Sequence, residues 1–173
     1  MRAKFIGPCL LLALAVAAVA QSSSGADWSK YSSEPGKFSM LMPGHPEEGS
    51  STDKGVVLHT FKLLVRPRLY MVVYSDYPEA DAKLETTHRL QAERDGFIKG
   101  ISGGRLISER QFTFKRNSED LPALEFTSET SNVNYKCVVI LDGTRVYFLG
   151  TGALKGVDST AEMERFLGSF KLL

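Results

Sequence analysis

The sequence predicts a single α+β domain in which helices pack on a mainly antiparallel sheet. Two early strand-like runs are apolar on both faces, so the sheet that they form must be covered from both sides. Four further strand-like runs follow one another between two helical segments. Parallel doubly wound folds need a regular alternation of strand and helix, and that alternation is missing here. We therefore expect one layered domain over residues 28–173.

The first residues have the three parts of a secretory signal peptide. Met1–Lys4 supplies two cations, Leu10–Val19 is apolar, and Ala18-Val19-Ala20 offers the small residues that a signal peptidase accepts. The apolar run is shorter than the about 20 residues needed to span a bilayer. We predict cleavage after residues 1–20 and a flexible Ser-, Gly- and Ala-rich tether over residues 21–27. The product would be periplasmic or secreted, with no transmembrane segment after signal removal.

Charge and cysteine content exclude several kinds of partner and cofactor. Removal of the signal peptide takes away Arg2 and Lys4 and no acid, so the formal net charge changes from +1 to −1. A nearly neutral protein has no electrostatic reason to bind nucleic acid. Cys137 is the one cysteine left in the cleaved product, so no intramolecular disulfide is expected. Neither a cofactor nor a metal ion is expected.

The early strands are predicted from their apolar pattern and from their turns. Residues 38–42 form a short strand, stopped by the Pro-Gly-His-Pro sequence of residues 43–46. Residues 56–65 and 69–75 are apolar on both faces, and Arg66-Pro67-Arg68 joins them. These two runs predict a hairpin in the middle of the sheet.

A helical period replaces the strand pattern between Asp81 and Ile101, with Asp81 as the expected N-cap and Gly100 near the end. The apolar stripe contains Leu84, Thr87, Leu90, Ile98 and Ile101, and the residues placed away from it are Lys83, Glu85, Glu93 and Lys99. Arg94 falls within the stripe. Either its stem packs while its guanidinium reaches water, or it is a buried cation paired with a carboxylate near a pocket.

Four strands are expected after this helix, over residues 105–114, 121–129, 135–141 and 145–151. Asp142-Gly143 predicts a two-residue type I′ turn. The pairs expected from the turns are Val139 with Val146, Cys137 with Phe148, and Glu129 with Lys136. The polar connection over residues 115–120 is expected to be mobile.

A second, short helix is predicted near the end of the chain. Ser159 and Glu162 have the spacing of a capping box, in which each side chain satisfies the other residue's backbone amide. Met163, Phe166 and Leu167 form its apolar stripe, so packing against the sheet must hold it in place.

The possible chemical motifs are all better interpreted as structural features. Ser102 lies in a G-x-S-x-G pattern, but a helix precedes it and a strand follows it, the reverse of a hydrolase elbow. Glu85 and His88 resemble half of a di-iron site that has no second half. His59 is interpreted as a core histidine, and three scattered histidines with one thiol do not suit zinc. No catalytic, metal-binding or cofactor-binding residue is predicted.

The acidic loop over residues 76–81 is where ligand or partner contacts are first expected, because loops held by a rigid sheet often have functional roles. The other interpretation of this loop is a polar connection that caps the next helix.

Several segments together resemble the small exported bacterial proteins of the PsbP-like fold. They are Trp28–Tyr31, Gly36–Pro43, Arg145–Leu149 and Phe166–Lys171. The resemblance implies an α-β-α sandwich that serves as a binding or accessory module. The photosynthetic members assist the oxygen-evolving complex, but none of their binding residues is matched to a position in this chain, so that role is not carried over.

The sequence thus favours an exported, non-enzymatic binding or accessory protein, whose partner is an envelope or extracellular protein or a small ligand. The alternative is a secreted hydrolase with an unrecognised active site near Ser102 or Arg94. A structural envelope component, recognisable by a large exposed apolar patch, is the third possibility.

Overall fold

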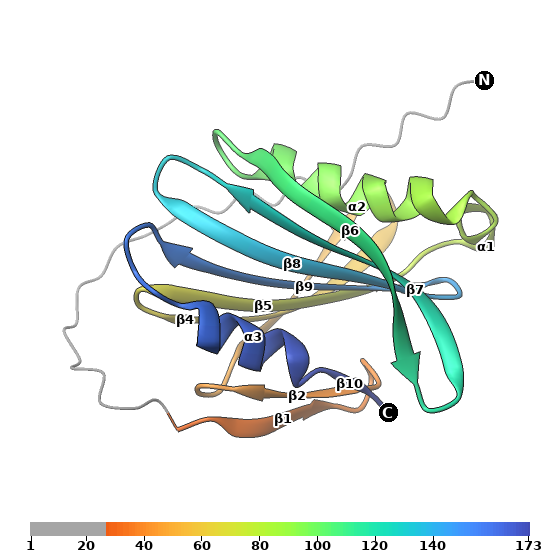
Figure 1. Ribbon diagram of the computed structural model, residues 1–173. Helices are drawn as coiled ribbons and strands as arrows, with labels where there is room; N and C mark the ends of the chain where they lie inside the picture. Colours follow the sequence, from red (N-terminus) through yellow and green to blue (C-terminus); the bar gives the residue numbers. More distant parts are fainter. Residues whose placement is uncertain (1–26) are drawn as a thin grey trace.

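The computed structural model describes residues 27–173, so the expected signal peptide and all but the last residue of the expected tether lie outside the described residues (Figure 1). Its main feature is a seven-stranded sheet in which all neighbours are antiparallel, in the order β3-β4-β5-β9-β8-β7-β6. The strands are β3 (Glu47–Asp53), β4 (Val56–Val65), β5 (Arg68–Asp76), β6 (Arg105–Arg116), β7 (Glu119–Glu129), β8 (Val133–Asp142) and β9 (Arg145–Leu154). The expected central hairpin is β4–β5, joined through Arg66 and Pro67.

A second sheet has three strands in the order β1-β2-β10, and it brings together the two ends of the described chain. The strands are β1 (Ser29–Ser33), β2 (Phe38–Met42) and β10 (Lys171–Leu172). The sequence pattern missed β1 and β3. Both are edge strands with mostly exposed, polar side chains, so they lack the alternation that marks a half-buried strand.

The helices lie on opposite faces of the large sheet (Figure 1). They are α1 (Glu79–Ala82), α2 (Thr86–Gly100) and α3 (Thr160–Gly168). Helix α2 packs on β7 and β8, whereas α3 packs on β8, β9 and β2. The mainly antiparallel sheet with helices packed on it is therefore confirmed. The α-β-α description fits less well, because a small sheet shares one outer layer with α3.

Buried apolar side chains occupy both faces, as the two-sided apolar strands required. The cluster under α2 includes Leu58, Met71, Val73, Leu90, Phe126, Cys137, Val139, Val146 and Phe148. The cluster under α3 and the small sheet includes Phe38, Met40, Met42, Phe61, Tyr70, Val72, Tyr147, Phe166 and Phe170. Each fully buried side chain of this size contributes about 1.5–3 kcal/mol relative to an exposed one.

The first long helix begins later than the sequence predicts. Glu85, not Asp81, is its N-cap: the Glu85 carboxylate accepts hydrogen bonds from the backbone amides of Thr87 and His88, each at 2.8 Å. These two bonds are the main reason that the pKa of the Glu85 carboxyl is lowered. They also explain the Glu85–His88 spacing as a cap.

The turns between β7, β8 and β9 differ from the predicted ones by two residues in register. Asp142 stays within the ladder opposite Arg145, so the β8–β9 loop is Gly143-Thr144. Val139 consequently lies opposite Phe148, and Cys137 lies opposite Gly150. The prediction placed the turn one residue too early. A shift of two keeps every side chain on its expected face.

The predicted Glu129–Lys136 pair is wrong for the same kind of reason. Glu129 lies opposite Asn134, and its carboxylate binds the Lys155 ammonium at 2.8 Å. The Lys136 ammonium instead lies 2.5 Å from Glu164 of α3 and 3.5 Å from Glu125.

The connection over residues 115–120 is shorter than expected. Strands β6 and β7 extend to Arg116 and Glu119, which leaves a tight turn with Asn117 at a φ of 52°. Asparagine tolerates this left-handed conformation better than most residues.

The predicted capping box at α3 is also wrong, although Ser159 is the N-cap residue. The Ser159 hydroxyl makes no capping bond; it accepts from Nε of Arg68 at 3.0 Å. The Glu162 carboxylate also binds Arg68, at 2.8 Å. The amide of Thr160 donates instead to the Asp158 carboxylate at 3.1 Å. Arg68 therefore ties the start of α3 to β5.

Candidate functional site

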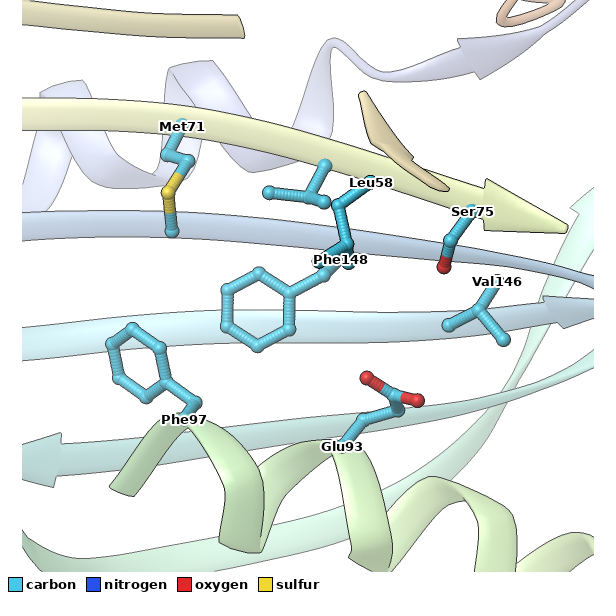
Figure 2. A pocket seen from close by; sticks show the side chains of 8 residues that line it. Leu58, Met71, Ser75, Glu93, Phe97, Val146 and Phe148 are labelled. Carbon is cyan, nitrogen blue, oxygen red and sulfur yellow. The ribbon is translucent and has the colours of Figure 1, made fainter. Parts of the chain in front are cut away.

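A partly open cavity of about 40 Å³ lies between α2 and the large sheet (Figure 2). Its lining is formed by Leu58 of β4, Met71, Val73 and Ser75 of β5, Val146 and Phe148 of β9, and Glu93 and Phe97 of α2. Six of these eight side chains are apolar. The cavity is therefore an apolar space with a few polar groups, the usual composition of a ligand site.

The position of α2 explains why the cavity exists. The helix packs on β7 and β8, so the same face of β4 and β5 continues beyond its edge. The register places Val73 opposite Phe148 and Ser75 opposite Val146, which gives the cavity a flat floor. Phe97 closes one side, with its ring centroid 5.1 Å from that of Phe148.

Glu93 is the charged residue in the lining, and Figure 2 shows its carboxylate pointing from α2 toward the sheet. One carboxylate oxygen accepts a hydrogen bond from the Tyr77 hydroxyl at 2.8 Å. No other described residue donates a hydrogen bond to Glu93 or forms an ion pair with it within 4.0 Å. Desolvation raises the pKa of this carboxyl, opposed by the Tyr77 hydrogen bond and by the charge of Arg89.

Arg89 lies near Glu93, but its guanidinium donates hydrogen bonds to backbone carbonyl oxygens instead. It donates to the carbonyl oxygen of Gly143 at 2.9 Å and to that of Ala82 at 3.4 Å. A smaller adjoining cavity of about 10 Å³ is lined by Tyr77, Asp81, Arg89, Ala92, Glu93 and Val146. The positive charge is thus fixed at the α1 end of the site.

The acidic loop over residues 76–81 contributes to this site in part. Tyr77 and Asp81 line the smaller cavity. Desolvation, reinforced by Glu93, raises the pKa of the Tyr77 phenol. Asp76 faces elsewhere, and its carboxylate binds the Arg145 guanidinium at 2.6 and 2.7 Å. This hydrogen bonding lowers the pKa of Asp76.

Arg94 combines features of both interpretations. Only 11% of its side chain is exposed, and its guanidinium binds Asp95 at 2.8 Å and also binds Glu109. It is therefore a largely buried, paired cation. It does not line either cavity.

Ser102 and His88, two side chains considered for catalysis or metal binding, lie at opposite ends of α2. Ser102 is exposed in the turn after α2, and α2 itself is about 22 Å long, so His88 at its start lies far away. His59 is half-buried and stacks on Tyr74, with ring centroids 4.6 Å apart. Burial raises the pKa of the Cys137 thiol well above its ordinary value.

Residues 27–173 contain no group of three or more His, Cys, Asp or Glu side chains placed to hold a metal ion. In the same residues, no helix has the length and apolar character needed to cross a membrane.

Sequence reasoning missed Glu93, which the helical pattern placed away from the apolar stripe. The signal that could have found it is the four-residue spacing of Arg89, Glu93 and Phe97, which puts the three side chains in one row along α2. Because Phe97 contacts Phe126, Tyr135 and Phe148, this row faces the sheet.

Comparison with solved structures decides the fold. The solution structure of cyanobacterial PsbP (CyanoP) from Synechocystis sp. PCC 6803 matches with a TM-score of 0.59 and 14% identity, over 90% of this chain and 98% of that one. The chain has a PsbP-like fold. At this identity the PsbP-like fold says nothing of a shared role.

Two other structures are less similar. Protein PA94 of unknown function from Pseudomonas aeruginosa has a TM-score of 0.41 and 13% identity, over 74% of this chain and 83% of that one. A protein from Bacteroides thetaiotaomicron has a TM-score of 0.38 and 12% identity, over 83% and 48%. No family model matches the chain, and no curated protein matches it.

Proposed function

We propose that this chain is an exported, non-enzymatic binding protein whose cavity beside α2 encloses one end of a small ligand. The supporting observation is an apolar cavity that contains one desolvated carboxylate. One water occupies about 10–15 Å³ by the same measure, so a cavity of about 40 Å³ accommodates the end of a molecule. The remainder of the ligand must lie outside it.

The lining favours binding over catalysis. A desolvated carboxyl could act as a general acid, but a reaction also needs a nucleophile or a second acid–base group beside it. The neighbouring groups are the Ser75 hydroxyl, with no histidine, cysteine or lysine in the lining to activate it, and the Tyr77 phenol, whose raised pKa keeps it protonated. The hydrolase alternative would be recognised by ester turnover that Ser102→Ala or Glu93→Gln abolishes.

The cavity is tested by filling it. In the double variant Val73→Ile/Val146→Ile, each substitution adds one methylene group to the lining and keeps a β-branched side chain in its strand. The matched control is Val57→Ile/Val157→Ile, which adds the same atoms at positions that are 43% and 39% exposed.

We expect 1-hexanol to shift the methyl NMR signal of Met71 saturably in the wild type and in the control. In the filled variant the affinity should fall about tenfold or more, since the added methylene groups occupy the space of the ligand. Thermal unfolding of each variant establishes that it is folded. No saturable shift in the wild type, or equal affinity in all three proteins, would contradict the proposal.

Export is tested separately, by N-terminal sequencing of the protein recovered from an envelope or culture fraction. The expected first residue is Gln21, because the small residues before it suit a signal peptidase. A cytosolic protein that retains residues 1–20 would exclude this part of the proposal.

A further inference from the structure

The cavity continues into an apolar strip on the same face of the large sheet. The strip consists of Leu64, Leu69, Val133, Tyr135 and Leu154. Leu64 pairs with Leu69, Leu69 and Tyr135 both pair with Gly152, and Val133 pairs with Leu154. Directly opposed residues share a face, and so do residues two apart in a strand. The strip therefore joins the cavity through Met71, which follows Leu69 by two positions.

Two glycines keep the floor between the strip and the cavity flat. A Cβ on Gly152 would lie 2.8 Å from the ring of Tyr135, and one on Gly150 would lie 3.0 Å from the ring of Phe148. The rings of the two aromatic residues thus lie over the glycines. Because α2 packs on β7 and β8, it leaves this part of the face open.

Two leucines of the strip are about half exposed to solvent. Leu64 is 50% exposed and Leu154 is 48% exposed, whereas the other three residues are half-buried. Large apolar side chains gathered at one place on a surface mark a site of interaction.

The opposite end of this groove is polar and negative. Glu93 has one carboxylate oxygen that accepts no hydrogen bond from a described residue, and the Ser75 hydroxyl lies in the same lining. The charged or titratable neighbours of Glu93 are Arg89 of α2, Tyr77 of the β5–α1 connection and Asp81 of α1. The strands of the floor contribute no charged group to the lining. An anionic head group would meet the carboxylate, whereas a protonated amine would pair with it.

We propose, on the basis of the function proposed above, that the ligand is a cationic amphiphile: a primary amine that Glu93 binds, with an aliphatic tail that lies along the strip. Ser75 and Leu69 are six residues apart in β5, so the groove extends about 20 Å from its polar end. The tail follows β5 and β9 from the cavity toward Leu64 and Leu154. The charge of Glu93 favours an amine head group, and the apolar strip favours an aliphatic tail.

The head group is tested by isothermal titration calorimetry with n-decylamine, 1-decanol and decanoate, each below its micellar concentration, at neutral pH. We expect decylamine to bind about tenfold or more tightly than decanol, and decanoate to bind most weakly. Glu93→Gln should remove the preference for the amine and leave decanol binding within about threefold. The control, Glu34→Gln, changes an exposed glutamate in the β1–β2 turn and should leave all three affinities unchanged.

The tail is tested by comparing n-decylamine, whose chain ends over the cavity, with n-hexadecylamine, whose chain is long enough to reach the strip, each below its micellar concentration. In the wild type the longer amine should bind at least tenfold more tightly, since its additional carbons cover the strip. Leu64→Ser/Leu154→Ser should remove most of this gain and leave decylamine unchanged. The control is Leu173→Ser, which changes a leucine that is 59% exposed at the last residue.

The possible outcomes separate this inference from the proposed function. If hexanol, decanol and decylamine all fail to bind, the cavity is not a ligand site and both proposals fall. If decanol and decylamine bind equally, or if decanoate binds best, the amine assignment falls and the cavity proposal stands. If sedimentation shows a dimer that Leu64→Ser/Leu154→Ser dissociates, a second copy covers the strip and the tail assignment falls.

Discussion

The two faces of the large sheet are covered in different ways. On one face, α3 and the three-stranded sheet close over aromatic side chains, and the Tyr147 hydroxyl donates to the carbonyl oxygen of Gly36 at 2.9 Å. On the other face, a single helix covers β7 and β8 and leaves a cavity beside it. A layer built from three strands and a helix covers more of the sheet than one helix does. The α3 face is therefore packed for stability, and the α2 face has space for a ligand.

Two charged groups on the α3 face are fully paired, whereas Glu93 on the α2 face is not. On the α3 face, Arg68 is satisfied by Ser159 and Glu162, and Lys136 is satisfied by Glu125 and Glu164. On the α2 face, Glu93 has one hydrogen bond and no ion pair within the described part of the chain. The second carboxylate oxygen of Glu93 lies at a partly open cavity, where a ligand can reach it.

The largest expected effect comes from the same substitution made on each face. Phe166→Ala removes a ring that is 0% exposed, and we expect a loss of about 3–5 kcal/mol in the free energy of unfolding. Phe97→Ala removes a half-buried ring that already lines a cavity, so the loss should be roughly half as large. Urea denaturation measures both. Equal losses would show that the two faces are packed equally well.

A second comparison uses two carboxyls whose pKa values are shifted in opposite directions. Desolvation raises the pKa of Glu93, so the folded state holds its proton more tightly than the unfolded state does. Its contribution to stability is therefore present below the ordinary value of 4.5 and is lost as the pH rises through the raised value. A tenfold difference in proton affinity between the two states corresponds to about 1.4 kcal/mol. Relative to Glu93→Gln, the wild type should become less stable as the pH rises.

Asp76 should behave in the opposite way, because Arg145 lowers its pKa. Its contribution is present above the ordinary value of 3.8 and is lost as the pH falls through the lowered value. The Asp76 side chain is 54% exposed, so solvent screening keeps the effect below about 1 kcal/mol. Thermal unfolding of Asp76→Asn and Glu93→Gln between pH 3 and 8 measures both slopes. Slopes of the same sign would contradict the assignment of the two environments.

A third comparison concerns the attachment of α3. Ser159→Ala should cost about 1 kcal/mol in the wild type, because it removes the hydrogen bond from Arg68. In an Arg68→Met background the same substitution should have almost no effect, since the bond is already lost. A double-mutant cycle measures this coupling. If Ser159→Ala destabilises the protein equally in the Arg68→Met background, the Ser159 hydroxyl caps α3 after all.

The sequence predicted the layers well because strands with apolar side chains on both faces, such as β4 and β5, are stable only in a sheet that is covered from both sides. It could not supply β1 and β3, whose polar residues form strands only because β2 and β4 offer hydrogen-bonding edges. Nor could it fix the β8–β9 register, because Asp142-Gly143 and Gly143-Thr144 both satisfy a turn. These features depend on how a strand pairs with its neighbour, which the pattern within one strand does not show.

The candidate site was harder to predict than the fold. The acidic loop stays a prediction for ligand contacts, and its Tyr77 and Asp81 line the smaller cavity of the candidate site. Glu93 was assigned to the solvent side because a carboxylate on the inner side of a helix contradicts the apolar pattern. Such contradictions between local pattern and position are expected where a residue has a role other than stability.

The pairing of β2 with both β1 and β10 has a consequence for biosynthesis. The backbone amide of Leu173 donates to the carbonyl oxygen of Lys37 at 2.9 Å, so strands about 130 residues apart meet in one ladder. A ribosome must therefore complete β10 before the outer layer can close. Until then the growing chain shows Tyr70, Val72 and their neighbours to water, and a chaperone that holds such chains would have its target there.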